Sequence, residues 1–221
     1  MRFGVDWVES GRFSARAGRR VSLLRVDATS TTWHASVDGM LWAWLSTLPH
    51  FNFPLETVDG SFGLSLDAVH GPWSGRLRYG HASSHLGDGE NDIEERRIVY
   101  SREAASLIGA FAPKAAWRVY AGPTFVVRGD PHTSAFQMEL GGEARASRVA
   151  GALQPYAAFD LRMKSENANR VNQSYEVGVR LGGTSGDALR VAAGYESGIS
   201  ERGQLWRTDE QFFRLGLAFG E

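Results

Sequence analysis

Polar and apolar residues alternate with a period of two along most of this chain. In one representative segment, Phe62, Leu64 and Leu66 alternate with Ser65 and Asp67. Successive side chains of a β-strand point to opposite faces of a sheet. The alternation therefore predicts strands that have one apolar and one polar face.

Twelve alternating segments can be traced, and most of them are about 10–16 residues long. They lie at roughly 2–13, 19–28, 33–46, 57–70, 73–85, 95–112, 115–128, 133–146, 149–164, 176–181, 190–196 and 213–219. Strands of soluble sandwiches have about 5–6 residues, whereas a tilted membrane strand needs about 9–11. The lengths therefore favour a membrane-spanning barrel.

The connections between these segments alternate between short and long. The short ones fall at 29–30, 71–72, 112–113, 147–148 and 184–187. The longer, polar or mixed ones fall at 47–56, 86–94, 129–132, 165–169 and 200–209. Outer-membrane barrels have short periplasmic turns and long extracellular loops. We therefore expect an all-β fold, a transmembrane antiparallel β-barrel of twelve strands in a bacterial outer membrane. It would form a single domain over residues 1–221, with its apolar face outward and both termini periplasmic.

The alternative is a soluble β-sandwich or lipocalin-like barrel, whose apolar residues would point inward. Composition favours the membrane barrel. The chain is rich in Gly and aromatic residues, with 26 Gly, 12 Phe, 7 Trp and 6 Tyr, yet its mean hydropathy is only -0.28. Such barrels are polar overall and carry their hydrophobicity in the alternation. Trp33, Trp73 and Trp117 lie at strand ends, where aromatic belts occur. Residues 1–5 already have the pattern of a strand, so we expect either that a leader has been cleaved or that the chain is cytoplasmic.

Charge and cysteine content exclude several classes of function. The net charge of -1 gives no bulk attraction to nucleic acid, so no nucleic-acid partner is expected. The chain has no Cys, which excludes disulfides, thiolate metal sites and a Cys nucleophile. With the apolar face outward, the lumen is balanced in charge and rich in Arg. This predicts a salt-bridged interior and at best a narrow pore.

The fifth segment contains the candidate chemistry. Its apolar face runs through Leu77 and Tyr79 and continues in phase to His81 and Ser83. Residues two apart on one strand face are separated by about 6.6 Å, so His81 can act as general base for a Ser83 nucleophile. If the following hairpin is symmetric about Asp88, residue 95 faces residue 81.

Residue 95 is Glu95, which would orient the imidazole as the third member of a triad. The phase of the sixth segment is poor, and a β-bulge near Ser101–Arg102 would reconcile it. In that case Glu94, rather than Glu95, would share the face of His81.

This arrangement resembles two outer-membrane lipid hydrolases, outer-membrane phospholipase A and lipid A 3-O-deacylase. Both use a His-x-Ser on the lipid-facing side of a barrel, with an Asn or Glu supplied by the next strand. The resemblance implies a serine esterase that acts on outer-membrane lipid through Ser83, His81 and Glu95 or Glu94. The Asn that usually follows the Ser in these enzymes is Ser84 here.

A longer set of motifs resembles a bacterial outer-membrane family catalogued as a domain of unknown function, number 1207. These motifs are HASSHLGD at 81–88, YSRE at 100–103, WRVYAG at 117–122, AFDL at 158–161 and GQLW at 203–206. The family implies an outer-membrane barrel but brings no established activity.

The alternatives to lipid hydrolysis are non-enzymatic. Polar residues are common at the wet interface of a membrane, so His81 and His85 fit an interfacial rim. Asp88 and Glu90 belong to an acidic loop and are candidate ligands for calcium, the one cofactor that the sequence suggests. The working hypothesis is therefore hydrolysis of an acyl ester of outer-leaflet lipid. The alternatives are a structural or cation- and lipid-binding barrel, or a narrow pore for a small solute.

Overall fold

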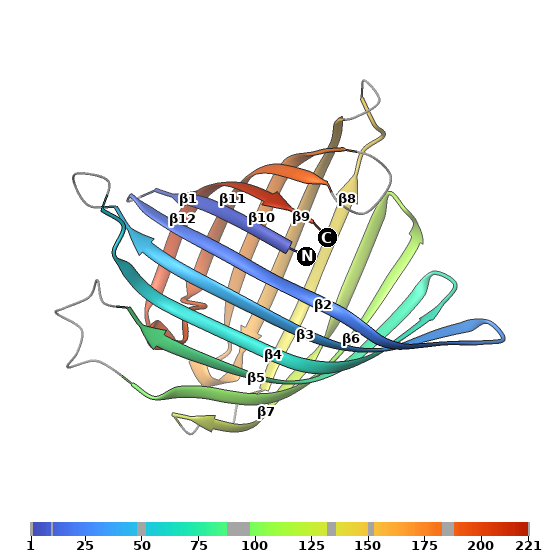
Figure 1. Cartoon of the computed structure of the whole chain (residues 1–221), viewed down its shortest axis with the longest axis horizontal. Helices are drawn as coiled ribbons and strands as arrows, with labels where there is room; N and C mark the ends of the chain where they lie inside the picture. The colour runs from blue at the N-terminus through green and yellow to red at the C-terminus, as the bar shows by residue number, and fades with distance from the viewer. Residues whose placement is uncertain are drawn as a thin grey trace.

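The protein is a closed antiparallel β-barrel (Figure 1). The computed structural model describes residues 2–9, 11–47, 52–87, 98–131, 136–149, 153–182 and 188–220. The strands are β1 (Arg2–Val8), β2 (Arg12–Ala28), β3 (Thr31–Ser46), β4 (Leu55–His70), β5 (Trp73–Leu86), β6 (Tyr100–Lys114), β7 (Trp117–Asp130), β8 (Phe136–Arg145), β9 (Leu153–Lys164), β10 (Arg170–Leu181), β11 (Leu189–Ile199) and β12 (Asp209–Phe219). The predicted twelve-stranded barrel is confirmed.

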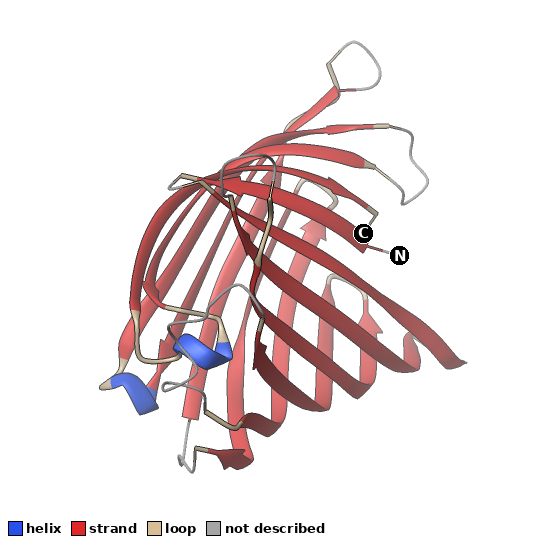
Figure 2. Ribbon diagram, turned by 60° about the vertical axis from the view of Figure 1, so that its left-hand side comes forward, coloured by secondary structure: helices blue, strands red, loops and turns tan. Residues whose placement is uncertain are grey.

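Each strand pairs with its neighbours in sequence, and β1 pairs with β12 to close the barrel. In this seam Phe3 lies opposite Phe219, so the two ends of the chain meet at one end of the barrel (Figure 1). The 3-10 helices η3 (Ser165–Asn167) and η4 (Gly203–Leu205) lie at the other end (Figure 2). That end also carries the connections that the sequence predicts to be long.

The outer wall of the barrel is apolar and the interior is charged. Leu64 is 61% exposed and Leu217 is 54% exposed, whereas Asp6 and Arg202 are buried. A continuous apolar exterior is typical of a surface that faces lipid. The soluble alternative, with an apolar core, is therefore wrong. Within the described part of the chain, no helix is long and apolar enough to span a membrane.

Ion pairs line the lumen, as the sequence predicts. Arg78 donates three hydrogen bonds to Asp38, the shortest of them 2.7 Å long. Arg214 binds Glu176 at 2.8 Å and Glu196 at 3.0 Å from the middle of β12. Buried charges are stable only when they are paired in this way.

Two segments differ from the prediction. The expected strand over 2–13 is divided, because the chain turns at Gly11, whose φ of +72° is readily adopted only by glycine. The expected turn at 112–113 is also displaced, since β6 continues to Lys114.

The expected β-bulge near Ser101–Arg102 is wrong as well. The pairing of β5 with β6 is continuous from Trp73 and Phe111 to Ser84 and Tyr100. The irregularity lies instead in the pairing of β6 with β7, between Glu103 and Ala104. The alternation in β6 is weak because the apolar residues Ala104 and Ile108 face the lumen, as Arg102 and Ala110 do. It does not indicate an interruption of the β5–β6 pairing.

Candidate functional site

His81 and Ser83 lie on the same, outer face of β5, as the alternation predicts. The ring of His81 lies 5.2 Å from that of Phe62, which is 64% exposed on the outer wall. A Cβ on Gly60, the residue opposite Ser83, would lie 3.9 Å from Ser83 Oγ and 3.3 Å from the exposed side chain of Leu41. The Ser83 hydroxyl therefore shares the outer wall with these apolar groups.

The acid opposite His81 is Glu103, supplied by β6. The predicted pairing of His81 with residue 95 is wrong, because the hairpin is longer than expected: β5 continues to Leu86 and β6 begins at Tyr100. Glu94 and Glu95 lie outside the described residues. Since directly opposed residues have Cβ atoms about 4.5–5.5 Å apart, Glu103 stands within reach of the His81 ring.

Glu103 is held by a neighbour and faces a cation. Its Oε2 accepts a hydrogen bond of 2.9 Å from the hydroxyl of Tyr79, the outward residue that precedes His81 on β5. On its other side Glu103 pairs with Arg128 of β7. Four outward positions on adjacent strands thus form one row: Phe62, His81, Glu103 and Arg128. We call His81, Ser83, Glu103 and Arg128 the outer patch.

The members of the outer patch are close but not joined into a triad. Among the described residues, no hydrogen bond links Ser83 Oγ to a ring nitrogen of His81 or links that ring to Glu103. The His81 ring packs against Phe62 of β4, on the side away from β6. Apo enzymes often show such open geometry, which tightens when substrate binds.

The residues that follow Ser83 do not supply an oxyanion or metal site in the described chain. Ser84 points into the lumen, where its Oγ accepts a hydrogen bond of 3.1 Å from the Gln204 amide. The backbone amide of Gly87, which is close enough to Ser83 in sequence to be considered as an oxyanion donor, instead donates to the Glu56 carbonyl at 2.7 Å. Asp88 and Glu90 lie outside the described residues. Elsewhere in the described chain, no group of three His, Asp or Glu residues is placed to hold a metal ion.

A second polar region, which the sequence did not predict, closes the end of the barrel opposite the termini. The connection between β11 and β12, residues 200–208, folds inward across the mouth; we call it the plug (Figure 2). Its Arg202 is buried and binds Glu56 of β4 at 2.7 Å and also Glu210 of β12. Its Gly203 amide donates to Asp59 of β4 at 2.8 Å.

The plug also attaches to the inner side of β5. Gln204 Nε2 donates to the Ser84 carbonyl at 2.7 Å and to the Ile98 carbonyl at 3.0 Å. Trp206 is buried against Arg102 of β6, whose guanidinium lies 5.6 Å from the ring. The apolar Leu205 and Trp206, in a loop expected to be polar or mixed, were the available signal of this inward fold.

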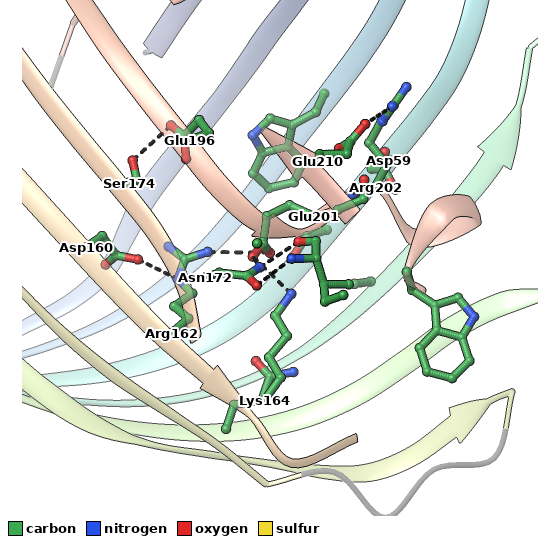
Figure 3. Close-up of a pocket in the computed structure, with 18 of the residues that line it drawn as sticks. Asp59, Asp160, Arg162, Lys164, Asn172, Ser174, Glu196, Glu201, Arg202 and Glu210 are labelled. Atoms are coloured by element: carbon green, nitrogen blue, oxygen red, sulfur yellow. Dashed lines mark hydrogen bonds and ion pairs between the residues drawn. The ribbon is translucent and has the colours of Figure 1, made fainter. Parts of the chain in front are cut away.

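Below the plug lies a cavity of about 690 Å³ inside the barrel. Lys164 Nζ binds Glu201 at 2.9 Å there, and Asn172 donates to the same carboxylate (Figure 3). Partial desolvation opposes ionisation of Glu201, whose side chain is 54% exposed, but the cations Lys164 and Arg162 outweigh it and lower its pKa to about 2. The cavity wall is therefore charged and internally paired at neutral pH.

Comparison with known sequences assigns the chain to a family. The family described as "Protein of unknown function (DUF1207)" matches residues 14–220. The chain belongs to this family. The match includes β5, β6 and the plug, and so confirms the resemblance of the motifs at 81–88, 100–103 and 203–206. No curated protein sequence matches the chain.

Solved structures of outer-membrane barrels share the fold. An active-site variant of outer membrane phospholipase A from Escherichia coli matches 100% of this chain and 90% of its own, with a TM-score of 0.62 and 12% identity. KdgM porin matches 100% of this chain and 98% of its own, with a TM-score of 0.55 and 6% identity. NanC porin matches 100% and 99%, with a TM-score of 0.51 and 10% identity. At these identities the likeness establishes an outer-membrane type of barrel and not an activity.

Proposed function

We propose that this DUF1207 protein hydrolyses an acyl ester of outer-membrane lipid, with Ser83 as nucleophile, His81 as general base and Glu103 as the acid that orients the imidazole. One observation carries the proposal: the β5–β6 register sets Glu103 opposite His81 on the outer wall, with Ser83 on the same face. An outer-leaflet lipid in a bacterial outer membrane is the substrate that such a site would meet. The fold shared with a phospholipase supports this proposal.

The surroundings of the outer patch favour a catalytic role over a structural one. On one side lie the exposed Leu41 and Phe62, and on the other the exposed Phe125 and Val127. Polar groups on a lipid-facing surface are costly and rare unless they serve a function. A Ser, a His and a Glu within an apolar wall therefore support a site that acts on membrane lipid.

The chemistry follows from the three roles. His81 removes the proton from Ser83 Oγ as that oxygen attacks the ester carbonyl carbon. Glu103 stabilises the imidazolium, which then protonates the departing alkoxide. Water, activated by His81 in the same way, hydrolyses the acyl-enzyme and releases a fatty acid. This cycle requires the His81 ring to turn from Phe62 towards Ser83 and Glu103.

Lipid mass spectrometry on the purified protein in vesicles of outer-membrane phospholipid and lipopolysaccharide tests the proposal. We expect release of fatty acid that Ser83→Ala and His81→Ala abolish and that Glu103→Gln reduces. Ser101→Ala is the matched control, because Ser101 lies opposite Ser83 on the outer wall. Release that survives Ser83→Ala would refute the nucleophile. No release from any lipid would favour the non-enzymatic alternatives.

The same assay with calcium or a chelator tests Asp88 and Glu90, which we propose as a cation-binding pair in the loop after β5. We expect activity to fall with the chelator and to lose its calcium dependence in Asp88→Asn. Unchanged activity in both conditions would remove calcium from the proposal.

An open pore is the weaker alternative. The plug crosses one mouth of the barrel and is fixed on the inner wall by the pair of Arg202 with Glu56. Steady conduction through a planar bilayer by the unmodified protein would nevertheless support the pore.

A further inference from the structure

Arg128 is the last residue of the outward-facing row that runs from Phe62 through His81 and Glu103. It reaches this position through the irregularity in the pairing of β6 with β7. Ala104 pairs with Val126, but Glu103 pairs with Arg128, so Val127 is an extra residue on β7. Val126 lines the interior cavity, whereas Val127 and Arg128 are both exposed. Bulges of this kind re-aim side chains next to functional sites.

The guanidinium of Arg128 has no carboxylate partner among the described residues. Glu103, its neighbour across the strand pair, gives its described hydrogen bond to Tyr79 instead. Two exposed arginines elsewhere are ion-paired: Arg25 binds Asp27 at 3.1 Å and Arg170 binds Asp209 at 2.5 Å. Arg128 thus presents its fork of donors on the outer wall, where an anion from the membrane is the available partner.

We propose that Arg128 binds the phosphate of the lipid whose acyl ester is presented to Ser83. This inference rests on the proposed function and names its substrate class. Guanidinium groups match phosphate oxygens in bidentate geometry. Adjacent strands are about 4.8 Å apart, so Arg128, two strands from His81, lies roughly 10 Å to the side of the base. The substrate is therefore a lipid in which a phosphate ester stands close to an acyl ester, as in glycerophospholipids and lipid A.

Equilibrium binding, measured by native mass spectrometry in detergent micelles, tests this assignment without relying on turnover. All variants carry Ser83→Ala, so that bound lipid is not consumed. The probes are phosphatidic acid against diacylglycerol with the same chains, and phosphorylated against dephosphorylated lipid A. The variants are Arg128→Gln, Arg128→Lys and, as the matched control for loss of an exposed arginine, Arg25→Gln.

We expect Arg128→Gln to weaken binding of a phosphorylated probe about tenfold, as loss of a charge-assisted hydrogen bond implies. Binding of the unphosphorylated partner should not change. Arg128→Lys should retain part of the affinity, and Arg25→Gln all of it. The lipid pair that responds identifies the source of the phosphate.

Equal losses for phosphorylated and unphosphorylated lipid, or equal losses in Arg128→Gln and Arg25→Gln, would overturn the assignment. Both outcomes are independent of whether fatty acid is released. Failure of this inference is therefore distinguishable from failure of the proposed hydrolysis.

Discussion

The polar residues on the two faces of β5 differ in their hydrogen bonding. On the inner face, Ser84 is held by Gln204 of the plug through its hydroxyl and its carbonyl. On the outer face, Ser83 lies beside His81 and Gly60 without a described hydrogen bond. Adjacent residues of one strand are thus bound into a network on one side and left available on the other.

β6 repeats this contrast. Arg102 is 6% exposed, binds Glu166 at 2.6 Å and lies 4.9 Å from the ring of Tyr100. Glu103, the next residue, faces outward and contacts only Tyr79 among its described hydrogen-bond partners. Ion-paired groups inside the barrel stabilise the structure, whereas polar groups on a costly lipid-facing surface are retained for what they bind. Substitutions in the plug should therefore change stability, and substitutions in the outer patch should change activity.

The largest effect is expected from Ser83→Ala. Loss of the proposed nucleophile should lower the rate of the proposed lipid hydrolysis by about 10⁴-fold or more. The free energy of unfolding should change by less than about 0.5 kcal/mol, because Ser83 lies outside any described network. Assays of fatty acid release and denaturant unfolding in the same vesicles measure both. A large loss of stability would mean that the outer patch has a structural role, as the residues bound by the plug do.

Arg202→Ala should have the next largest effect, which we expect on stability rather than on hydrolysis. It leaves the buried Glu56 without its cation and Glu210 with only Arg12, 3.5 Å away, which should cost about 3–5 kcal/mol of unfolding free energy. Equilibrium unfolding followed by tryptophan fluorescence measures this change. Arg207→Ala, which removes an exposed arginine of the same loop, is the control and should be nearly neutral.

Gln204→Ala should show whether the two faces communicate. The carbonyls of Ser84 and Ile98 lose their described donor, which should cost about 1–3 kcal/mol. Because Ser84 follows the nucleophile directly, we also expect hydrolysis to fall severalfold. Gln211→Ala on the exposed side of β12 is the matched control. A stability loss with undiminished hydrolysis would mean that the outer patch does not depend on the plug.

The smallest effect concerns pH. The folded protein holds the pKa of Glu201 at about 2, below the ordinary glutamate value of 4.5. Its contribution to stability is therefore present above pH 4.5 and is lost as the pH falls towards 2. Unfolding measured from pH 7 to 2 should show this loss in the native protein and not in Glu201→Gln. A decline of the same size in Glu201→Gln would show that the Glu201 carboxylate does not contribute to stability.

The barrel and its outward face follow from the sequence, because the side-chain period of a strand is fixed at two. Once Leu77 and Tyr79 face lipid, His81 and Ser83 must face it also. The partner of His81 could not be predicted in the same way. Register depends on the length of the intervening loop, and a turn centred on Asp88 predicted Glu95 or, with a bulge, Glu94, whereas the longer hairpin sets Glu103 opposite His81.

The plug was beyond prediction for a different reason. Its partners Glu56, Asp59 and Ser84 precede Arg202, Gly203 and Gln204 by more than one hundred residues. No local pattern around Gly203 encodes a contact with β4. The inward orientation of Ser84 follows from the alternation, but its donor does not.

The position of the plug has a consequence for how the chain reaches its final shape. The plug lies between β11 and β12 and is hydrogen-bonded to β4 and β5, so it connects opposite sides of the barrel wall. These ties join residues distant in sequence, so their loop-closure cost is met only after the hairpins have brought the strands together. We expect the plug to seat last, once the seam between β1 and β12 has closed. Once seated, the plug should connect opposite sides of the barrel, oppose flattening of its cross-section and restrict motion of the part of β5 that carries Ser83.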